Sequence, residues 1–214
     1  MRLLKLMTLQ FLTMLVLTSC FGDKKVADIS QMNDTSFVNE NFKGNRINYS
    51  EDMSACESIS AADIALIYNV SEDNIVINDI TKTDRRQPNS PPSCLFYIKT
   101  GDNDFEWLRG SMNIQREIKK DEMAYDVAKA AGNSEEWEEA WAINKSISKS
   151  SEWIKDLGMA AVWNQKKSEL RIKFKGYTLN IYPIKNKLNQ AEVAKNRNYK
   201  NVAIAMAKAS GFIK

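Results

Sequence analysis

The sequence predicts an α+β domain in which an antiparallel sheet of about six strands carries helices packed on one face. Two observations predict this class. Short segments with alternating apolar residues are typical of strands, and apolar residues spaced three or four apart mark helices before, between and after those segments. Each half of the chain reads helix, three strands, helix, which suggests a duplicated unit without a residue-level repeat.

The first half is expected to begin with a helix and continue with three strands. Ser60 and Asp63 resemble a capping box, so the helix should begin there. Residues 101–104 have the composition of a hairpin turn between the second and third strands. Residues 84–92 contain three prolines, which exclude a central strand or a helix interior, and form an exposed loop. The three expected strands are 74–80, 94–100 and 105–118.

A helix closes the first half, and the second half then repeats the order helix, three strands, helix. Asp121 is expected to cap a helix that ends at Gly132, and Ser134 is expected to cap the helix that carries Trp137 and Trp141. Alternating apolar residues then predict further strands, and a last helix carries apolar residues at helical spacing. The expected ranges are strands 159–163, 169–174 and 177–183, and a helix at 199–212.

The beginning of the chain has the pattern of an export signal. Arg2 and Lys5 precede an almost charge-free run that is too short to span a bilayer as a stable helix. The run ends in Leu17-Thr18-Ser19-Cys20, which resembles the lipobox of bacterial lipoproteins, where the cysteine is diacylated and becomes the new N-terminus. The resemblance implies a signal peptide at 1–19, a lipid on Cys20 and a membrane-anchored protein of the bacterial cell envelope. The alternative is a buried helix followed by an ordinary core thiol.

The remaining chain divides into a tether and one domain. Residues 20–53 are rich in polar residues with few apolar ones, and such a segment buries too little surface to offset its ordering entropy. We therefore expect a flexible tether at 20–53. Residues 54–214 have the length of a single α+β domain.

The cysteine count predicts a disulfide. If Cys20 carries a lipid, Cys56 and Cys94 remain as an even pair in a chain expected to reach an oxidising compartment. Two buried thiols or a metal pair are the alternatives. Because the chain has no histidine, a zinc site would need carboxylates, and we expect no metal and no cofactor.

A second resemblance covers residues 54–214. It rests on Leu157-Gly158-Met159-Ala160-Ala161-Val162-Trp163, a polar turn, Leu170-Arg171-Ile172 and a terminal alanine-rich helix, together with a cysteine before a short helix and another at a strand start. This stretch resembles one common in small cysteine-paired lipoproteins of unknown function, which usually carry an acidic residue where Met159 stands. The resemblance implies an α+β envelope domain that binds a ligand or partner, and it supplies no catalytic residues.

Composition argues against several classes of function. The net charge of +3 includes Arg2 and Lys5, and lysine and glutamate alternate along the chain, so we expect no nucleic-acid partner. The absence of histidine excludes Ser–His and Cys–His nucleophile pairs. Ser146 and Lys149 have the Ser-x-x-Lys spacing of penicillin-binding proteins, but the companion motifs are absent and we expect a solvated helix end.

These exclusions favour a non-catalytic binding or accessory module with an envelope protein or a glycan as partner. Trp137 and Trp141 are interpreted first as core residues, with an exposed ridge that contacts a partner as the alternative. Arg85 and Arg86 are candidates for holding an acidic partner, against the simpler interpretation of a solvated loop. Other functions kept open are an immunity-type envelope protector, a structural protein, and a glycan-active enzyme with two converging carboxylates.

Overall fold

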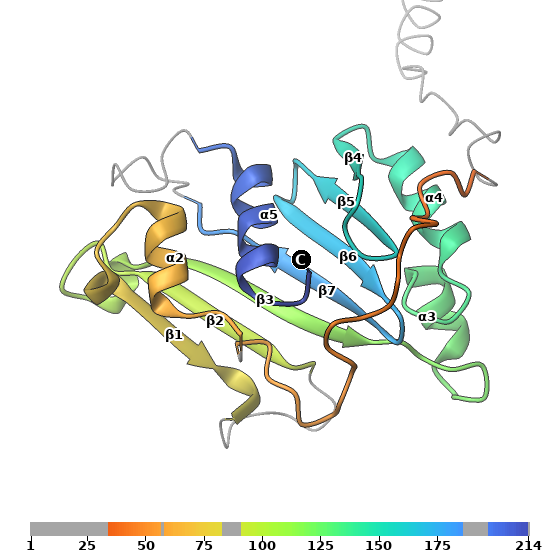
Figure 1. Ribbon diagram of the computed structural model, residues 1–214, viewed down its shortest axis with the longest axis horizontal. Helices are drawn as coiled ribbons and strands as arrows, with labels where there is room; N and C mark the ends of the chain where they lie inside the picture. Colours follow the sequence, from red (N-terminus) through yellow and green to blue (C-terminus); the bar gives the residue numbers. More distant parts are fainter. Residues whose placement is uncertain (1–33, 57, 83–90, 186–196, 214) are drawn as a thin grey trace, which may run out of the picture.

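The computed structural model describes residues 34–56, 58–82, 91–185 and 197–213, which form an open seven-stranded antiparallel sheet with four α-helices (Figure 1). The predicted α+β class is thereby confirmed, with one strand more than expected. The helices are α2 (Ala61–Tyr68), α3 (Tyr125–Ala131), α4 (Glu138–Ile147) and α5 (Tyr199–Ala209). The strands are β1 (Ile75–Asp79), β2 (Ser93–Ile98), β3 (Leu108–Arg116), β4 (Ser151–Ile154), β5 (Ala160–Asn164), β6 (Glu169–Phe174) and β7 (Tyr177–Tyr182).

The strand order β1-β2-β3-β7-β6-β5-β4 joins the two halves of the chain through β7. On one side β7 pairs with β3, where Leu179 lies opposite Ile114, and on the other it pairs with β6, where Leu179 lies opposite Ile172. The expected halves of three strands each are not found, because the second half contains the additional strand β4. That strand has only four residues, Ser-Glu-Trp-Ile, and so few residues give no clear alternation.

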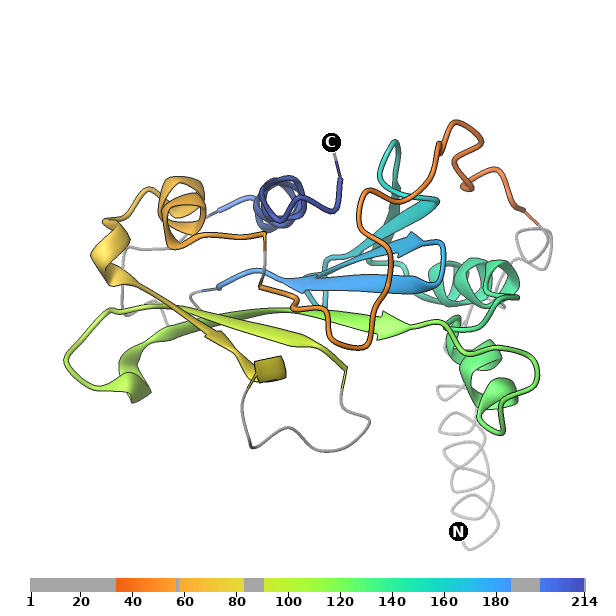
Figure 2. The same cartoon turned by 60° about the horizontal axis from the view of Figure 1, so that its bottom comes forward.

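The main core lies between the sheet and the helices α2 and α5, which lie beside each other on one face (Figure 2). Helix α2 begins as predicted: the Ser60 hydroxyl accepts from the Asp63 N–H at 3.1 Å, and the Asp63 carboxylate accepts from the Ser60 N–H at 2.9 Å. Its buried Ile64 and Tyr68 pack on the sheet together with Met206 of α5. This reciprocal cap fixes where the helix starts and therefore which side chains it buries.

Helix α4 packs on the opposite face of the sheet, which corrects the prediction of helices on one face only. Ala161 and Trp163 of β5 belong to the main core, whereas Ala160 packs with Trp137 and Trp141 in a second cluster. Because successive side chains of a strand point to opposite faces, the second cluster lies on the other side of the sheet. Helix α5, which contacts β6 and β7, and helix α4 therefore lie on opposite faces of the sheet.

The helices α3 and α4 begin differently from the prediction. Neither Asp121 nor Ser134 caps a helix, since the N-cap residues are Ala124 and Trp137 and neither makes a side-chain capping bond. The Ser134 hydroxyl instead accepts from the Glu136 N–H at 3.2 Å, before α4 begins. Asp121 and Ser134 therefore lie three residues before the observed N-cap residues of α3 and α4.

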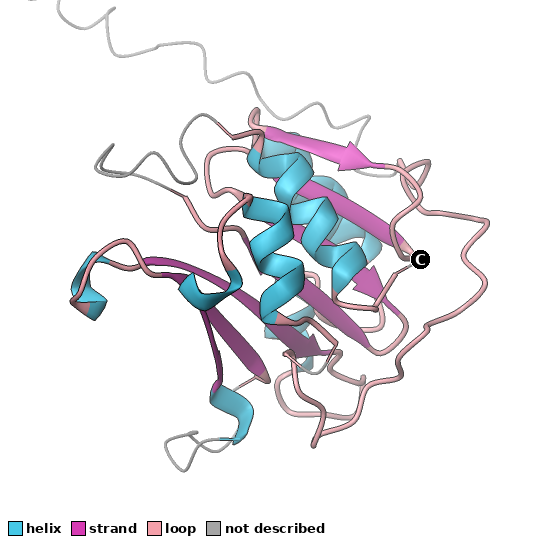
Figure 3. Cartoon of the chain, turned by 60° about the vertical axis from the view of Figure 1, so that its left-hand side comes forward, coloured by secondary structure: helices cyan, strands magenta, loops and turns pink. Residues whose placement is uncertain are grey.

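The segment before α2 is part of the domain, so the predicted boundary between residues 53 and 54 is wrong. Residues 34–53 run as an irregular loop along the domain (Figures 1 and 3). Phe37 stacks on Trp153 with ring centroids 4.0 Å apart, and the Tyr177 hydroxyl donates to the Ile47 carbonyl at 2.7 Å. The few spaced apolar residues of this segment therefore bury enough surface to hold it, and the earlier part of the predicted tether, 20–33, lies outside the described residues.

The predicted disulfide is confirmed between Cys56 and Cys94, whose Cα atoms lie 5.0 Å apart. Cys94 is fully buried in β2, and Cys56 lies just before α2 at the edge of the main core. The bond joins segments separated by 38 positions in the chain. It therefore ties the segment that leads into α2 to the start of β2, where Cys94 lies opposite Asp79 of β1.

Candidate functional site

The face of the sheet opposite α2 and α5, called the far face below, carries polar side chains from its three central strands. In β6 the residues Leu170, Ile172 and Phe174 belong to the main core. The alternate residues therefore point to the far face, and the same alternation applies to β3 and β7. The polar residues placed there are Arg109, Ser111, Asn113 and Gln115 of β3, Glu169, Arg171 and Lys173 of β6, and Thr178, Asn180 and Tyr182 of β7.

Two of the three charged residues of β6 have charged or strongly polar partners. Lys173 is fully buried, forms an ion pair with the Glu117 carboxylate, and lies 5.7 Å from the centre of the Trp137 ring. The Glu169 carboxylate accepts from the Tyr182 hydroxyl and lies 4.0 Å from the Lys167 ammonium. Both groups are therefore compensated within the protein.

Arg171, between these two residues, forms no ion pair, although the Glu169 carboxylate favours its charged form at longer range. Its guanidinium lies 4.9 Å from the centre of the Trp141 ring and donates to Asn133 Oδ1 at 3.3 Å. It forms no ion pair with any residue that the structure describes. Burial lowers the pKa of Arg171 from its ordinary value because desolvation disfavours the cation.

Most N–H groups of Arg171 have no hydrogen-bond partner among the described residues. A guanidinium has five N–H donors, and only the bond to Asn133 engages one of them. Among the described residues, the Tyr125 hydroxyl is the one fully buried side-chain polar atom without a hydrogen-bond partner. No unbonded nitrogen of Arg171 is fully buried, so its remaining donors keep some contact with solvent.

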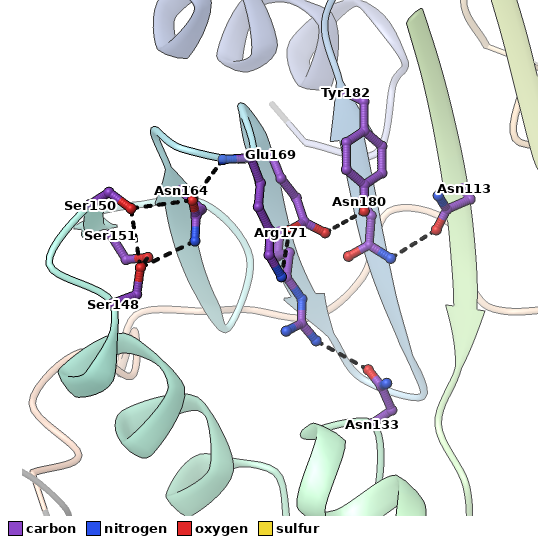
Figure 4. Close-up of polar contacts among 11 residues, drawn as sticks. Asn113, Asn133, Ser148, Ser150, Ser151, Asn164, Glu169, Arg171, Asn180 and Tyr182 are labelled. Carbon is purple, nitrogen blue, oxygen red and sulfur yellow. Dashed lines mark hydrogen bonds and ion pairs between the residues drawn. The ribbon is translucent and has the colours of Figure 1, made fainter.

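Two grooves share Glu169 and Arg171 in their linings. Figure 4 shows these two side chains between the serines that follow α4 and the asparagines of β3 and β7. The serine groove has a volume of about 290 Å³ and is lined by Trp141, Asn144, Lys145, Ser148, Ser150, Ser151, Val162, Asn164, Lys166, Lys167, Glu169 and Arg171. The asparagine groove has a volume of about 380 Å³ and is lined by Pro91, Ser93, Asn113, Gln115, Ala131, Asn133, Glu169, Arg171, Asn180 and Tyr182. Ligand sites usually measure about 300 to 1,000 Å³, so the two grooves together have the size of a small-ligand site.

The serine groove is built from hydroxyl and amide groups that bond to one another. Ser148 Oγ accepts from Ser151 Oγ at 2.9 Å and from Asn164 Nδ2 at 3.3 Å. Asn164 Oδ1 in turn accepts from the Lys167 N–H at 2.9 Å. This network joins the end of α4, the start of β4 and the turn after β5, and it fixes the polar wall of the groove (Figure 4).

The asparagine groove presents a pair of amides from neighbouring strands. Asn113 and Asn180 lie opposite each other in register, and Asn180 Nδ2 donates to Asn113 Oδ1 at 2.8 Å (Figure 4). The bond leaves Asn113 Nδ2 as a donor and Asn180 Oδ1 as an acceptor, neither with a partner among the described residues. A donor and an acceptor side by side suit a hydroxyl group, which both donates and accepts.

The tryptophans that were candidates for partner contact are buried. Trp137 and Trp141 are each 2% exposed, and the Trp141 indole donates to the Gly132 carbonyl at 2.9 Å. The alternative of an exposed aromatic ridge is therefore wrong, because these rings pack between α4 and the far face. Their rings contact the cations of β6, Trp141 with Arg171 and Trp137 with Lys173, and the edge of Trp141 also lines the serine groove.

Other candidates from the sequence fall outside the site. Arg85, Arg86 and Cys20 lie outside the described residues. The Ser146 hydroxyl donates to the Ile143 carbonyl of its own helix at 2.8 Å, and Lys149 is exposed. The Ser-x-x-Lys pair is thus a helix end, with its serine engaged by the backbone.

The sequence reasoning overlooked the residues that build the grooves. In the expected strand 169–174 it used Leu170, Ile172 and Phe174 and left the alternate charged residues uninterpreted. Asn113 and Asn180 offered a signal, because asparagine is depleted in strands and each stands among apolar neighbours. Their meeting with Arg171 depends on the strand order.

Comparisons with protein families, curated proteins and solved structures find no match to this chain. Its class is therefore defined by the fold and the grooves: an α+β domain with a polar face that carries two grooves. Within the described residues, no group of three acidic, histidine or cysteine side chains is arranged to hold a metal ion. Nor does this part of the chain contain a helix long and apolar enough to cross a membrane.

Proposed function

We propose that this chain is a lipid-anchored, non-catalytic binding module of a bacterial cell envelope, with its ligand site in the serine and asparagine grooves. The observation that carries the binding role is the meeting of the two grooves at Arg171, whose free donors have no acidic partner. The lipobox-like sequence before Cys20 supports the anchor, and the disulfide between Cys56 and Cys94 fits an oxidising compartment.

The lining of the grooves favours binding over catalysis. A glycan-active enzyme of the common kind needs two carboxylates that converge on the bond to be broken. Glu169 is the single carboxylate that lines either groove among the described residues, and it accepts from the Tyr182 hydroxyl. The remaining polar groups are amides, hydroxyls and cations, which orient and hold a ligand.

Two experiments test this proposal. Replacing Cys20 by serine should abolish incorporation of labelled palmitate and release the chain from the membrane fraction. A photoreactive phenylalanine derivative placed at Gln115, which is exposed and lines the asparagine groove, should form an adduct in cells, detected as a mass increase. The same group at Lys208, exposed on α5, is the matched control and should form none.

The outcomes separate the two parts of the proposal. A palmitate label that survives Cys20→Ser would contradict the anchor. No adduct at Gln115, or equal adducts at Gln115 and Lys208, would contradict the ligand site on the far face.

A further inference from the structure

We infer that the two grooves bind a saccharide that carries a phosphate or carboxylate group, with the anionic group held at Arg171 and the sugar hydroxyls held by the Asn113–Asn180 pair. The inference rests on the proposed binding function and specifies the chemistry of its ligand. The side chains that line each groove indicate which part of the ligand binds there.

The charge arrangement on β6 points to a missing anion. Lys173 has Glu117 as its partner, and Glu169 has Tyr182 and Lys167. Arg171 stands between them with an indole face and one amide oxygen. The Glu169 carboxylate acts on Arg171 only through the longer-range charge interaction, because it is already engaged by Tyr182 and Lys167. A half-buried cation without a close counter-charge is costly, and an arriving anion would lower that cost.

Arginine suits an oxyanion better than any other side chain. Its planar fork can donate two parallel N–H bonds to a phosphate or a carboxylate. The Trp141 ring, 4.9 Å from the guanidinium, limits the orientations of that fork. The N–H groups that remain unbonded face the grooves, so an anion would meet donors that are already oriented.

The serine groove adds a positive field to this arginine. Lys145, Lys166 and Lys167 line it together with Arg171, against the single carboxylate of Glu169. Lys166 and Lys167 are exposed, so salt screens their contribution and they act mainly by attracting the ligand. An anionic ligand is therefore favoured over a neutral or cationic one.

The side chains of the asparagine groove indicate the chemistry of the neutral part of the ligand. Asn113 Nδ2 and Asn180 Oδ1 offer a donor and an acceptor side by side, and no described residue uses either atom. A sugar hydroxyl can accept from the first and donate to the second. Because Arg171 lines both grooves, one ligand can reach the arginine and the amide pair together.

The test uses the purified full chain and three probes: glucose 6-phosphate, glucuronate and glucose. Isothermal titration measures affinity, and the indole N–H signal of Trp141 in an NMR spectrum reports binding beside Arg171. We expect saturable binding of at least one anionic probe, a shift of that indole signal, and at least tenfold weaker binding of glucose. Tighter binding of glucose 6-phosphate identifies phosphate as the anion, and tighter binding of glucuronate identifies carboxylate.

Variants locate the anion. Arg171→Gln should weaken binding by about tenfold or more, because hydrogen bonds to charged groups are among the strongest polar contacts. Arg116→Gln is the matched control and should bind normally, since Arg116 forms a bidentate pair with Glu122 and lines neither groove. If Arg171→Gln does not fold, the exposed pair Lys166→Gln and Lys167→Gln tests the negative charge of the ligand through a smaller loss, about twofold to fivefold.

Contrary results distinguish this inference from the proposed function. Equal binding of glucose and the two anionic probes, unaffected by Arg171→Gln, would refute the anionic ligand while leaving a ligand site on the far face. Failure of all three probes to bind would refute the saccharide inference. The proposed function would then stand or fall with the adduct at Gln115.

Discussion

The ion pair between Lys173 and Glu117 predicts an unequal response to the loss of either partner. The Lys173 side chain is 0% exposed, whereas that of Glu117 is 18% exposed. Glu117→Ala leaves a buried ammonium without its counter-charge, and such a loss costs about 3–5 kcal/mol. Lys173→Met removes the buried charge and keeps a long side chain beside Trp137, while the remaining carboxylate can reach water. Its expected cost is about 1 kcal/mol.

Urea unfolding followed by circular dichroism measures these differences as the free energy of unfolding. The double variant should resemble Lys173→Met, because Glu117→Ala costs little once the ammonium is gone. The coupling energy of the cycle should therefore be about 2 kcal/mol or more. Equal losses for the two single variants, or a larger loss for Lys173→Met, would refute the reasoning that the buried cation needs Glu117.

The pH dependence of the free energy of unfolding tests the burial of Lys173 independently. Burial lowers the pKa of Lys173 from its ordinary 10.5. Between the lowered value and 10.5 the unfolded chain binds more protons than the folded one, so stability contributed by this group rises with pH in that window. The rise should grow in Glu117→Ala, which loses the group that favours the charged form, and vanish in Lys173→Met. A rise that persists in Lys173→Met would assign it to another residue.

Three further predictions follow from single contacts. Reduction of the disulfide, which spans 38 positions, should lower the free energy of unfolding by about 4 kcal/mol in urea titrations, with no effect in a variant that lacks both cysteines. Gly132→Ala should cost about 2 kcal/mol or more in the same assay, because an added Cβ would lie 2.4 Å from the Trp141 ring at a φ of +74°. Gly176→Ala, at a φ of +86° with open space around it, is the control and should cost about half as much. The Glu122 carboxylate should titrate in NMR spectra with a pKa of about 2, because Arg116 bonds to it. In Arg116→Gln this pKa should return toward 4.5. The stability that the pair contributes is therefore present above pH 4.5 and is lost as the pH falls toward 2.

Much of the local structure could be predicted because it depends on neighbours in the chain. The capping box of Ser60 and Asp63 needs only four consecutive residues, and it forms as predicted. The alternation of Leu170, Ile172 and Phe174 likewise identifies β6 and its buried face. The pairing of Cys56 with Cys94 followed from counting cysteines once Cys20 was assigned to a lipid.

Features that depend on distant contacts were predicted wrongly or missed. The start of the domain was placed too late, because Phe37 appears isolated in the sequence and acquires its partner, Trp153, only in the fold. Trp137 and Trp141 could be core or surface residues by their spacing alone. Their burial is known only from the fold, in which both rings pack against Ala160 on the far face of the sheet.

The sequence by itself determined the composition of this protein's site: an arginine in a strand, asparagines in two others and no histidine anywhere. Tertiary structure alone decided that these residues meet. The strand β7 enters between β3 and β6, which places Asn180 beside Asn113 and also beside Arg171. The physical reason is that local propensity acts over a few residues, whereas strand order follows from burying the apolar faces of both halves in one core.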